Sequence, residues 1–244
     1  MKANFAEIME SIQGEGLLLG SKQVFLRFTG CNLRCSYCDT PASREHMPTG
    51  RLFIKTGSRQ EAEIFTNPLS AEQVHSYITD RFSSSWISLT GGEPLLWTDF
   101  IKELALTFKN SGYKFLLETN GTLGEQLSEC LPFIDMISMD IKLPSATASD
   151  CWDLHHSFLL KAREKPCYIK VVVTADTTFQ EIKQAASLVK SVGAGIPLIL
   201  QPVTCKSNCG CVPIDKLLAM QKLVLEELND VRIIPQLHPL MGLI

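Results

Sequence analysis

The chain has 244 residues, of which 45% are hydrophobic and 20% are charged, and its formal net charge is −3. This composition is typical of an ordinary globular protein, and without a basic run it argues against a nucleic-acid partner. No apolar stretch reaches the roughly 20 residues that span a bilayer, and the N-terminus lacks the apolar core of a secretory signal. We therefore expect one cytoplasmic domain without membrane association, acting on a small molecule.

Short apolar runs alternate with amphipathic segments from residue 23 onwards. Strands are predicted at 23–28, 86–90, 114–119, 134–140, 168–173, 197–202 and 231–235. Helices are predicted at 71–83, 100–109, after Thr178, and at 213–227, the first and third starting with the capping-box pairs Ser70/Gln73 and Thr178/Glu181. This alternation predicts βαβ units and a mostly parallel sheet. Right-handed crossovers would curl it into an α/β fold, a partial (β/α) barrel of six or seven strands.

Residues 41–69 do not fit this alternation. They mix Pro48, Gly50, Gly57 and Pro68 with charges of both signs. We interpret the segment as an insertion or a lid loop.

Polar and thiol side chains follow the predicted strands at their carboxyl ends, where parallel sheets place their chemistry. The candidates are Cys31 after the first strand, Gly91–Pro94 after the second, Glu118–Gly121 at the end of the third, Asp140 at the end of the fourth and Gln201 at the end of the sixth. The sequence thus predicts one site at one end of the barrel.

Cys31, Cys35 and Cys38 form a C-x3-C-x2-C run. Thiolates select iron–sulfur clusters, zinc or copper(I), and a structural zinc ion needs four ligands. His46 could supply the fourth ligand, although its spacing is unusual. A cubane held by three cysteines instead leaves one iron open for a substrate. A zinc knuckle or incidental thiols remain the alternatives at this point.

The other six cysteines are less informative. Cys130, Cys151 and Cys167 are scattered, and we interpret them as small buried or surface thiols. Cys205, Cys209 and Cys211 form a C-x3-C-x-C run after the sixth strand, which could bind an auxiliary cluster or consist of free loop thiols.

The cysteine run, together with Gly91-Gly92-Glu93-Pro94 after the next strand, resembles the signature of the radical S-adenosylmethionine (SAM) superfamily. The resemblance implies a [4Fe–4S] cluster whose open iron binds SAM, and reductive cleavage of SAM to a 5′-deoxyadenosyl radical. It also implies that the glycine-rich loop binds the SAM amino group and that Tyr37 packs near adenine. An electron donor such as flavodoxin or ferredoxin is then expected.

Further runs make nearly the whole chain except 41–69 similar to the 7-carboxy-7-deazaguanine synthase family. They are Ser11–Gly16, Arg27, Cys38-Asp39-Thr40, Ser138–Lys142 and Pro235–His238. The resemblance implies conversion of 6-carboxy-5,6,7,8-tetrahydropterin to 7-carboxy-7-deazaguanine on the route to queuosine, a magnesium dependence and a homodimer. It also implies a single radical SAM domain over 1–244, with residues 1–22 as a substrate-binding segment.

The family's functional residues can be carried over position by position. Cys31, Cys35 and Cys38 would hold the cluster and Thr40 would bind Mg²⁺, which prefers oxygen ligands. SAM would contact Tyr37, Gly92, Glu93, Asp140, Ile141, Lys142 and Gln201. Substrate would contact Ile12, Gln13, Gly14, Arg27 and Thr90. The fork of Arg27 suits a bidentate carboxylate contact, with a barrel-end salt bridge as the alternative, and Glu118 and Lys170 rank behind these residues.

Two other functions stay open from the sequence. An activase that installs a glycyl radical on a partner protein would share the cysteine run and the Gly91–Pro94 motif, but would not need Ser11–Gly16 or Arg27. A non-catalytic iron–sulfur or zinc protein would leave the Gly91–Pro94 motif unexplained.

Overall fold

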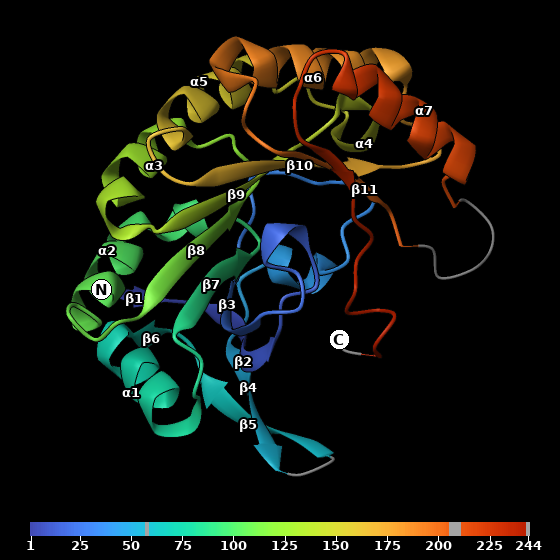
Figure 1. Ribbon diagram of the computed structural model, residues 1–244. Coiled ribbons are helices and arrows are strands. Elements are labelled where there is room, and N and C mark those ends of the chain that lie inside the picture. The colour runs from blue at the N-terminus through green and yellow to red at the C-terminus, as the bar shows by residue number, and fades with distance from the viewer. Residues whose placement is uncertain (57–58, 205–210, 243–244) are drawn as a thin grey trace.

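The computed structural model describes residues 1–56, 59–204 and 211–242. A curved sheet of ten strands runs through these residues in the order β12-β11-β10-β9-β8-β7-β3-β2-β4-β5. Helices line the outer, convex side of the sheet, and the C-terminal segment descends across its inner side (Figure 1). The arrangement is an open, partial (β/α) barrel.

The seven predicted strands form the parallel part of this sheet. Each pairs in parallel with its neighbour. Their bounds are β3 Lys22–Phe28, β7 Trp86–Gly91, β8 Lys114–Thr119, β9 Met136–Ile141, β10 Cys167–Val173, β11 Leu198–Pro202 and β12 Val231–Ile233. The prediction of six or seven mostly parallel strands is confirmed, and all the carboxyl ends of these strands lie at one edge of the barrel.

Helices connect the parallel strands. The α-helices are α1 Ala71–Arg81, α2 Thr98–Thr107, α3 Gly124–Cys130, α4 Pro144–Thr147, α5 Trp152–Ala162, α6 Phe179–Gly193 and α7 Ile214–Leu225. Short 3-10 turns occupy η1 Gly16–Leu18, η2 Pro41–Arg44, η3 Pro94–Trp97 and η4 Leu131–Phe133. Both predicted capping boxes are present, with Ser70 and Thr178 accepting hydrogen bonds from the backbone N–H groups of Gln73 and Glu181. The three helices α3, α4 and α5 were not predicted.

The sheet extends beyond the parallel strands at the N-terminal side. Strand β2 (Phe5–Ile12) pairs antiparallel with β3. The short strands β1 (Lys2–Ala3) and β6 (Leu69–Ser70) pair with each other in a separate two-stranded sheet. The lid-loop interpretation of 41–69 is wrong, because β4 (Thr49–Thr56) and β5 (Arg59–Thr66) form a hairpin that joins the sheet beside β2. Charged residues interrupt both strands of this edge hairpin, and Leu52-Phe53-Ile54 is its only run of three apolar residues.

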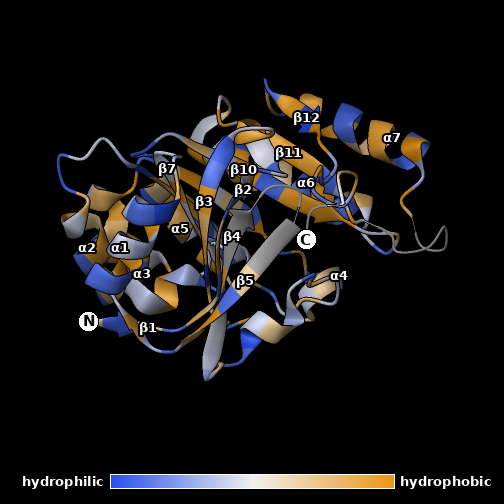
Figure 2. Ribbon diagram, turned by 90° about the horizontal axis from the view of Figure 1, so that it is seen from below, coloured by the Kyte–Doolittle hydropathy of each residue, from blue (hydrophilic) through white to orange (hydrophobic). Residues whose placement is uncertain are grey.

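The hydrophobic core lies between the sheet and the helices. Side chains such as Leu26, Leu89, Ile137 and Ile169 point outward from the strands and are fully buried against the helices. Figure 2 shows the hydrophobic character of β10 and β11, as expected for parallel strands covered by helices. No helix among the described residues is long and apolar enough to cross a membrane. The inner face of the barrel is left for polar residues, and these form the site.

Candidate active site

The loop from Cys31 to Cys38, here called the cysteine loop, follows β3 at the carboxyl edge of the barrel. Its three thiols are free and half-buried. The Ser36 N–H donates to the Ala146 carbonyl over 2.9 Å, and Arg44 Nη2 donates to the Cys35 carbonyl over 2.6 Å. These bonds hold the backbone of the loop, so the thiols remain available as ligands.

The spacing of the three thiols suits a large cofactor better than a single ion. A tetrahedral zinc site places sulfur ligands about 3.8 Å apart. Among the described residues the three cysteines do not form a group whose donor atoms all lie within 4.8 Å of one another. His46 is engaged elsewhere, since its Nδ1 lies 3.3 Å from Thr29 Oγ1 and its ring stacks edge-on against Trp97. The structure therefore disfavours a four-ligand zinc site completed by His46.

Backbone hydrogen bonds join the GGEP loop (Gly91–Pro94) to the start of the cysteine loop. The Gly92 N–H donates to the Phe28 carbonyl over 3.0 Å, and the Glu93 N–H donates to the Gly30 carbonyl over 2.8 Å. A Cβ at position 92 would lie 1.9 Å from the Gly30 oxygen. Gly91 has φ +118°, and a Cβ there would lie 2.3 Å from the Phe28 oxygen. Both glycines are thus required for this close approach.

The Glu93 side chain is fully buried and turned toward the end of β8. Its carboxylate accepts hydrogen bonds from the Leu95 N–H (3.1 Å), Thr119 Oγ1 (2.8 Å) and the Asn120 N–H (2.8 Å). Burial raises the pKa of Glu93 although these hydrogen bonds oppose the shift. The side chain therefore fixes the GGEP loop, and the loop backbone is what it presents to a ligand.

A buried histidine that the sequence did not indicate links two further loops of the site. His155 on α5 is fully buried, its Nδ1 lies 3.0 Å from the Gly121 carbonyl, and its Nε2 accepts a hydrogen bond from the Lys142 N–H over 3.0 Å. Burial lowers the pKa of His155, so the neutral ring with hydrogen on Nδ1 satisfies both contacts. His155 thereby sets the backbone position of Lys142.

Asn32 of the cysteine loop is similarly tied to the loop after β8. Its Oδ1 accepts from Asn120 Nδ2 over 2.8 Å, and its Nδ2 donates to Thr122 Oγ1 over 2.9 Å. The local signal for these residues was the polar run after the third predicted strand, but their partners could not be read from it.

Lys142 and Asp140 lie between the cysteine loop and the barrel interior. Lys142 Nζ is 2.7 Å from Asp140 Oδ2 and 5.3 Å from the centre of the Tyr37 ring. Burial would lower the pKa of Lys142, but the charge of Asp140 outweighs it and raises the pKa well above the ordinary value. Lys142 therefore stays charged beside the thiols.

Two buried polar atoms at this edge have no hydrogen-bond partner among the described residues. They are Asp140 Oδ1 and Gln201 Oε1, on residues that are 8% and 2% exposed. An unpaired buried acceptor costs about 1–3 kcal/mol, so these atoms fit a ligand that brings hydroxyl or ammonium donors. Both atoms lie near the carboxyl ends of their strands, β9 and β11.

Polar side chains continue down the inner face of the barrel. Gln13 Nε2 donates to Glu118 Oε1 over 3.0 Å, Thr90 Oγ1 donates to Glu118 Oε2 over 3.5 Å, and Ser88 also hydrogen bonds with Glu118. Gln13 is 3% exposed, so its amide is part of the wall of the barrel.

Arg27 on β3 sits opposite Glu7 of β2 and Thr90 of β7 in the strand registers. Its Nε donates to Glu7 Oε2 over 3.1 Å, and its side chain is 17% exposed. The predicted alternative of a salt bridge is therefore present, but it uses only Nε. The two Nη groups have no hydrogen-bond partner within the described part of the chain, which leaves them for an anionic ligand.

Comparisons with known proteins decide the family. The model of the radical SAM superfamily matches residues 25–196. The chain is 40% identical to 7-carboxy-7-deazaguanine synthase from Geobacter sulfurreducens, with 98% of this chain and 97% of that protein covered, and 36% identical to the enzyme of that name from Methanothermobacter thermautotrophicus, with 100% and 98% covered. The chain belongs to the 7-carboxy-7-deazaguanine synthase family of radical SAM enzymes.

The fold of this family is recognisable in a solved structure. The crystal structure of QueE from Escherichia coli superposes with a TM-score of 0.65 at 18% identity, covering 98% of this chain and 95% of that chain. A family member uses a [4Fe–4S] cluster and SAM. The three thiols, the close GGEP loop and the two unpaired acceptors fit these groups.

The position of Thr40 also fits a ligand role. Thr40 precedes η2 in the capping position, yet its side chain makes no capping hydrogen bond. Its hydroxyl has no hydrogen-bond partner in the described ranges. The residue is half-buried directly after the cysteine loop.

Glu15 is a further half-buried group of this family member, within the Ser11–Gly16 run that the sequence analysis noted but without a role predicted for it. It contacts Lys170 in an ion pair, and its Oε1 accepts from Gln201 Nε2 (3.1 Å) and Gln236 Nε2 (2.7 Å). Burial would raise the pKa of Glu15, but Lys170 brings it down to about 2. Of the second cysteine run, 205–210 lies outside the described residues, and Cys211 is exposed.

Proposed function

We propose that the chain converts 6-carboxy-5,6,7,8-tetrahydropterin to 7-carboxy-7-deazaguanine, with ring contraction and loss of ammonia. One observation carries the proposal. The GGEP loop is hydrogen bonded to the start of the cysteine loop at the carboxyl edge of the barrel, and below it Gln13 and Glu15 of the N-terminal segment contact Glu118 and Lys170. A catalytic loop, a cofactor loop and a family-specific segment thus share one site, and the relatives that span the whole chain carry this activity in their name.

The geometry supports the SAM-binding residues that the family resemblance implies. When bound, the cluster and SAM supply a 5′-deoxyadenosyl radical that abstracts hydrogen from the substrate. Lys142, held by His155 and Asp140 beside the Tyr37 ring, would meet the SAM carboxylate. Ribose hydroxyls would satisfy the unpaired acceptors of Asp140 and Gln201. The remaining contacts come from Gly92, Glu93 and Ile141.

The proposed substrate-binding residues lie on or near the inner face of the barrel. The free Nη groups of Arg27 would bind the pterin carboxylate, and Thr90, one strand further in the same register, would make an adjoining contact. Ile12, Gln13 and Gly14 would face the ring edge as part of a substrate-binding segment 1–22 within a single 1–244 domain. Thr40 would bind Mg²⁺ with water and substrate oxygens completing its shell.

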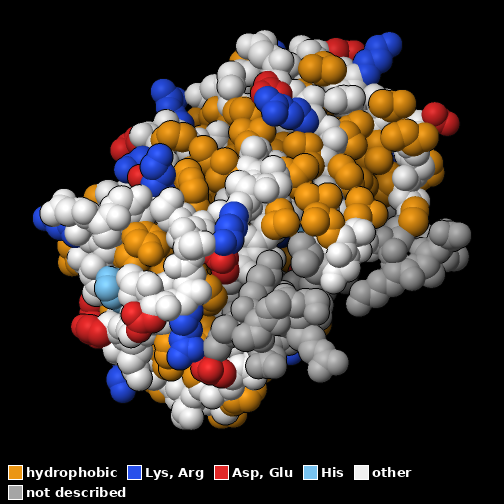
Figure 3. All heavy atoms as spheres, turned by 60° about the horizontal axis from the view of Figure 1, so that its bottom comes forward, with side chains coloured by type: hydrophobic (Ala, Val, Ile, Leu, Met, Phe, Trp, Pro, Cys, Tyr) orange, Lys and Arg blue, Asp and Glu red, His pale blue; other side chains and the backbone are white. Residues whose placement is uncertain are grey.

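The need for an electron and the exposed apolar side chains support two protein partners. Reductive cleavage needs one electron from outside, so we propose a donor such as flavodoxin or ferredoxin in a reducing cytoplasm. A homodimer is supported by exposed apolar side chains. On α7, Ile214, Leu218 and Leu225 are at least half exposed, and Figure 3 shows a broad area of hydrophobic side chains on one face of the molecule.

The test is an anaerobic assay of the reduced, reconstituted protein with SAM, with and without 6-carboxy-5,6,7,8-tetrahydropterin. We expect 5′-deoxyadenosine and 7-carboxy-7-deazaguanine in comparable amounts when the pterin is present, detected by mass spectrometry. If SAM is cleaved equally fast with and without the pterin and no deazapurine forms, the result would instead support the activase. The absence of 5′-deoxyadenosine in both samples would contradict any radical SAM activity.

A further inference from the structure

A row of polar side chains crosses the sheet at one level and begins on the β4–β5 hairpin. In the strand registers Arg51 of β4 lies opposite Glu7 of β2, and Glu7 lies opposite Arg27 of β3. Thr90 of β7 continues the row beyond Arg27. Side chains that lie directly opposite each other in paired strands point to the same face of a sheet. The hairpin thus brings a charged residue into line with two proposed substrate-binding residues.

Packing next to this row fixes the hairpin beside β2. Leu52 lies opposite Ile8, and the two side chains are 1% and 0% exposed in the hydrophobic core. At Gly50 a Cβ would lie 2.4 Å from the Phe5 carbonyl oxygen, so the two strands approach closely there. Successive side chains of a strand point to opposite faces. Because Leu52 points outward into the core, its neighbour Arg51 points to the inner face.

Glu7 forms ion pairs with the arginines on both sides. Its Oε1 accepts from Arg51 Nη2 over 2.5 Å, and its Oε2 accepts from Arg27 Nε over 3.1 Å. The Glu7 and Arg27 side chains are 10% and 17% exposed, so water and salt screen their charges poorly. Two positive charges and one negative charge leave a net charge of +1 on these three side chains. An anionic ligand at Arg27 would meet this positive charge.

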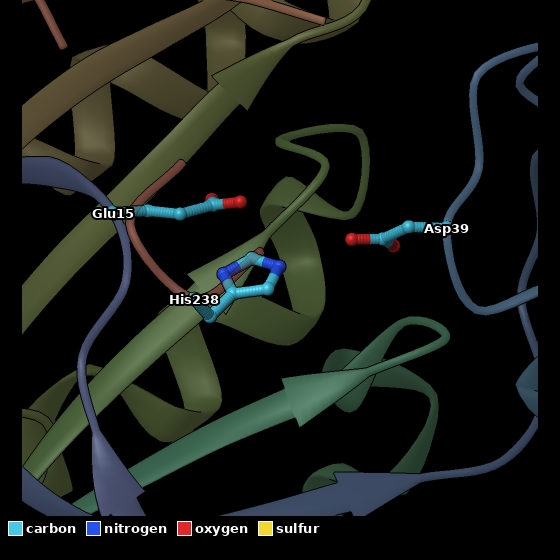
Figure 4. A group of neighbouring side chains, drawn as sticks. All are labelled: Glu15, Asp39 and His238. Atoms are coloured by element: carbon cyan, nitrogen blue, oxygen red, sulfur yellow. The ribbon is translucent and has the colours of Figure 1, made fainter. Parts of the chain in front are cut away.

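The barrel mouth has the opposite charge balance. Lys142 pairs with Asp140, Lys170 pairs with Glu15, and the Glu15 carboxylate faces that of Asp39 (Figure 4). Two ammonium groups therefore lie among three carboxylates. A carboxylate on the substrate would be repelled from these groups and attracted to the row that begins on the hairpin.

We propose that Arg51 is a positioning residue for the substrate, because it neutralises Glu7 and so leaves Arg27 to bind the pterin carboxylate. The inference rests on the proposed function, which takes Arg27 as the carboxylate ligand. Without Arg51, Glu7 Oε1 would be released, and the Glu7 carboxylate could turn both oxygens to Arg27 in a bidentate pair. It would then compete with the substrate for the same guanidinium. The hairpin is thus part of the substrate site and favours pterins that carry a carboxylate.

The test measures how much the carboxylate contributes to pterin binding. The stable fluorescent compounds 6-carboxypterin and pterin differ only in this group, and equilibrium dialysis against the reconstituted holoenzyme gives both dissociation constants. SAM is present and the cluster is kept oxidised, so that SAM is not cleaved. We expect the wild type to bind 6-carboxypterin about ten- to hundredfold more tightly than pterin. Arg51→Gln should reduce this preference about five- to tenfold without changing the affinity for pterin, whereas a general structural defect would weaken the binding of both compounds.

Compensating variants separate the electrostatic role from a structural one. Arg51→Lys keeps a cation, and an ammonium group can replace the single nitrogen, Nη2, that contacts Glu7. Adding Glu7→Gln to Arg51→Gln removes the competing charge and keeps an acceptor for Arg27 Nε. Both variants should return the preference to within about threefold of the wild type. Arg81→Ala is the matched control, because it breaks the ion pair between α1 and Glu63 of the same hairpin, and it should keep the wild-type preference.

The outcomes distinguish this inference from the proposed function. A wild-type preference in Arg51→Gln, or a loss that the added Glu7→Gln does not restore, would overturn the role of Arg51 and leave the placement of the carboxylate at Arg27 intact. Equal binding of the two pterins by the wild type would contradict both. The reaction itself is tested separately, by deazapurine formation in the anaerobic assay.

Discussion

Replacing Gly92 with alanine should separate the GGEP loop from the cysteine loop. The added Cβ would lie 1.9 Å from the Gly30 oxygen and 2.6 Å from its carbonyl carbon, and both are backbone atoms that no side-chain rotation can move away. The two loops must therefore move apart. This movement would break the hydrogen bond from the Glu93 N–H to the Gly30 carbonyl.

The free-energy cost of Gly92→Ala can be worked out from these contacts. Forcing a methyl group into a packed site costs about 1–3 kcal/mol, and a lost backbone hydrogen bond at a buried position adds about 1–2 kcal/mol. The sum is about 2–5 kcal/mol. For a chain of this size each kcal/mol lowers the melting temperature by about 2–4 °C, so we expect a decrease of roughly 4–20 °C.

The assay combines stability with cofactor binding. Differential scanning calorimetry under anaerobic conditions gives the melting temperature of the holoenzyme. The spectrum of the reduced cluster, recorded during SAM titration, gives the SAM affinity. Gly92→Ala should retain iron, because no thiol is altered, but should bind SAM at least tenfold more weakly.

Gly195→Ala is the matched control. A Cβ at position 195 meets no atom within 4 Å, and this glycine has no positive φ. The control should keep the wild-type free energy of unfolding to within about 1 kcal/mol and keep the SAM affinity. Equal melting temperatures and SAM affinities for Gly92→Ala and the wild type would refute the reasoning that the two loops act as one unit.

Four further changes test individual residues. Cys35→Ala should lower the iron content well below the roughly four irons per chain of a cubane and abolish 5′-deoxyadenosine formation; a cubane in this variant would contradict the ligand assignment. Arg27→Ala should raise the KM for the pterin about ten- to hundredfold while the SAM affinity stays constant, because a charge-assisted hydrogen bond contributes about 1.5–3 kcal/mol; an unchanged KM would show that the carboxylate binds elsewhere. Lys142→Met should weaken SAM binding at least tenfold with little effect on the KM for the pterin, as measured by titration of the reduced cluster. The pKa of Glu15 falls from its ordinary 4.5 to about 2 in the folded state, so its ion pair stabilises the protein above pH 4.5 and is lost as the pH falls toward 2. The urea unfolding free energy of the wild type should therefore decrease more steeply over that range than that of Glu15→Gln, and equal slopes would contradict the pairing.

The parallel half of the barrel was predictable because its strands are buried on both faces along nearly their whole length. Such strands appear as continuous apolar runs, and β10 and β11 follow this rule. The capping boxes were predictable because they depend on residues only three positions apart. Local patterns of this kind can be predicted because they do not depend on residues that are distant in sequence.

The missed elements depend on partners that are distant in sequence. Strand β2 was missed because Glu7 and Glu10 interrupt its apolar residues, and Glu7 is buried only because Arg27 and Arg51 pair with it. The hairpin β4–β5 is charged along its length and is held by its pairing with β2.

The residues of the site also divide into those that local sequence predicted and those that depend on distant partners. The thiols and the glycines were found from their spacing, since their chemistry requires them to be close in sequence. The side-chain direction of Glu93 was not predictable, because it is set by the end of β8, where Thr119 and Asn120 bond it. Glu15 and His238 come together only through the path of the C-terminal segment.

The most direct measurement is the electron paramagnetic resonance spectrum of the reduced, reconstituted protein before and after SAM is added. Three thiolate ligands would leave one iron of a cubane open to SAM, so the signal should shift on addition, and ⁵⁷Fe labelling should show one distinct iron. A spectrum that SAM leaves unchanged, or protein purified anaerobically with zinc in place of iron, would contradict this account.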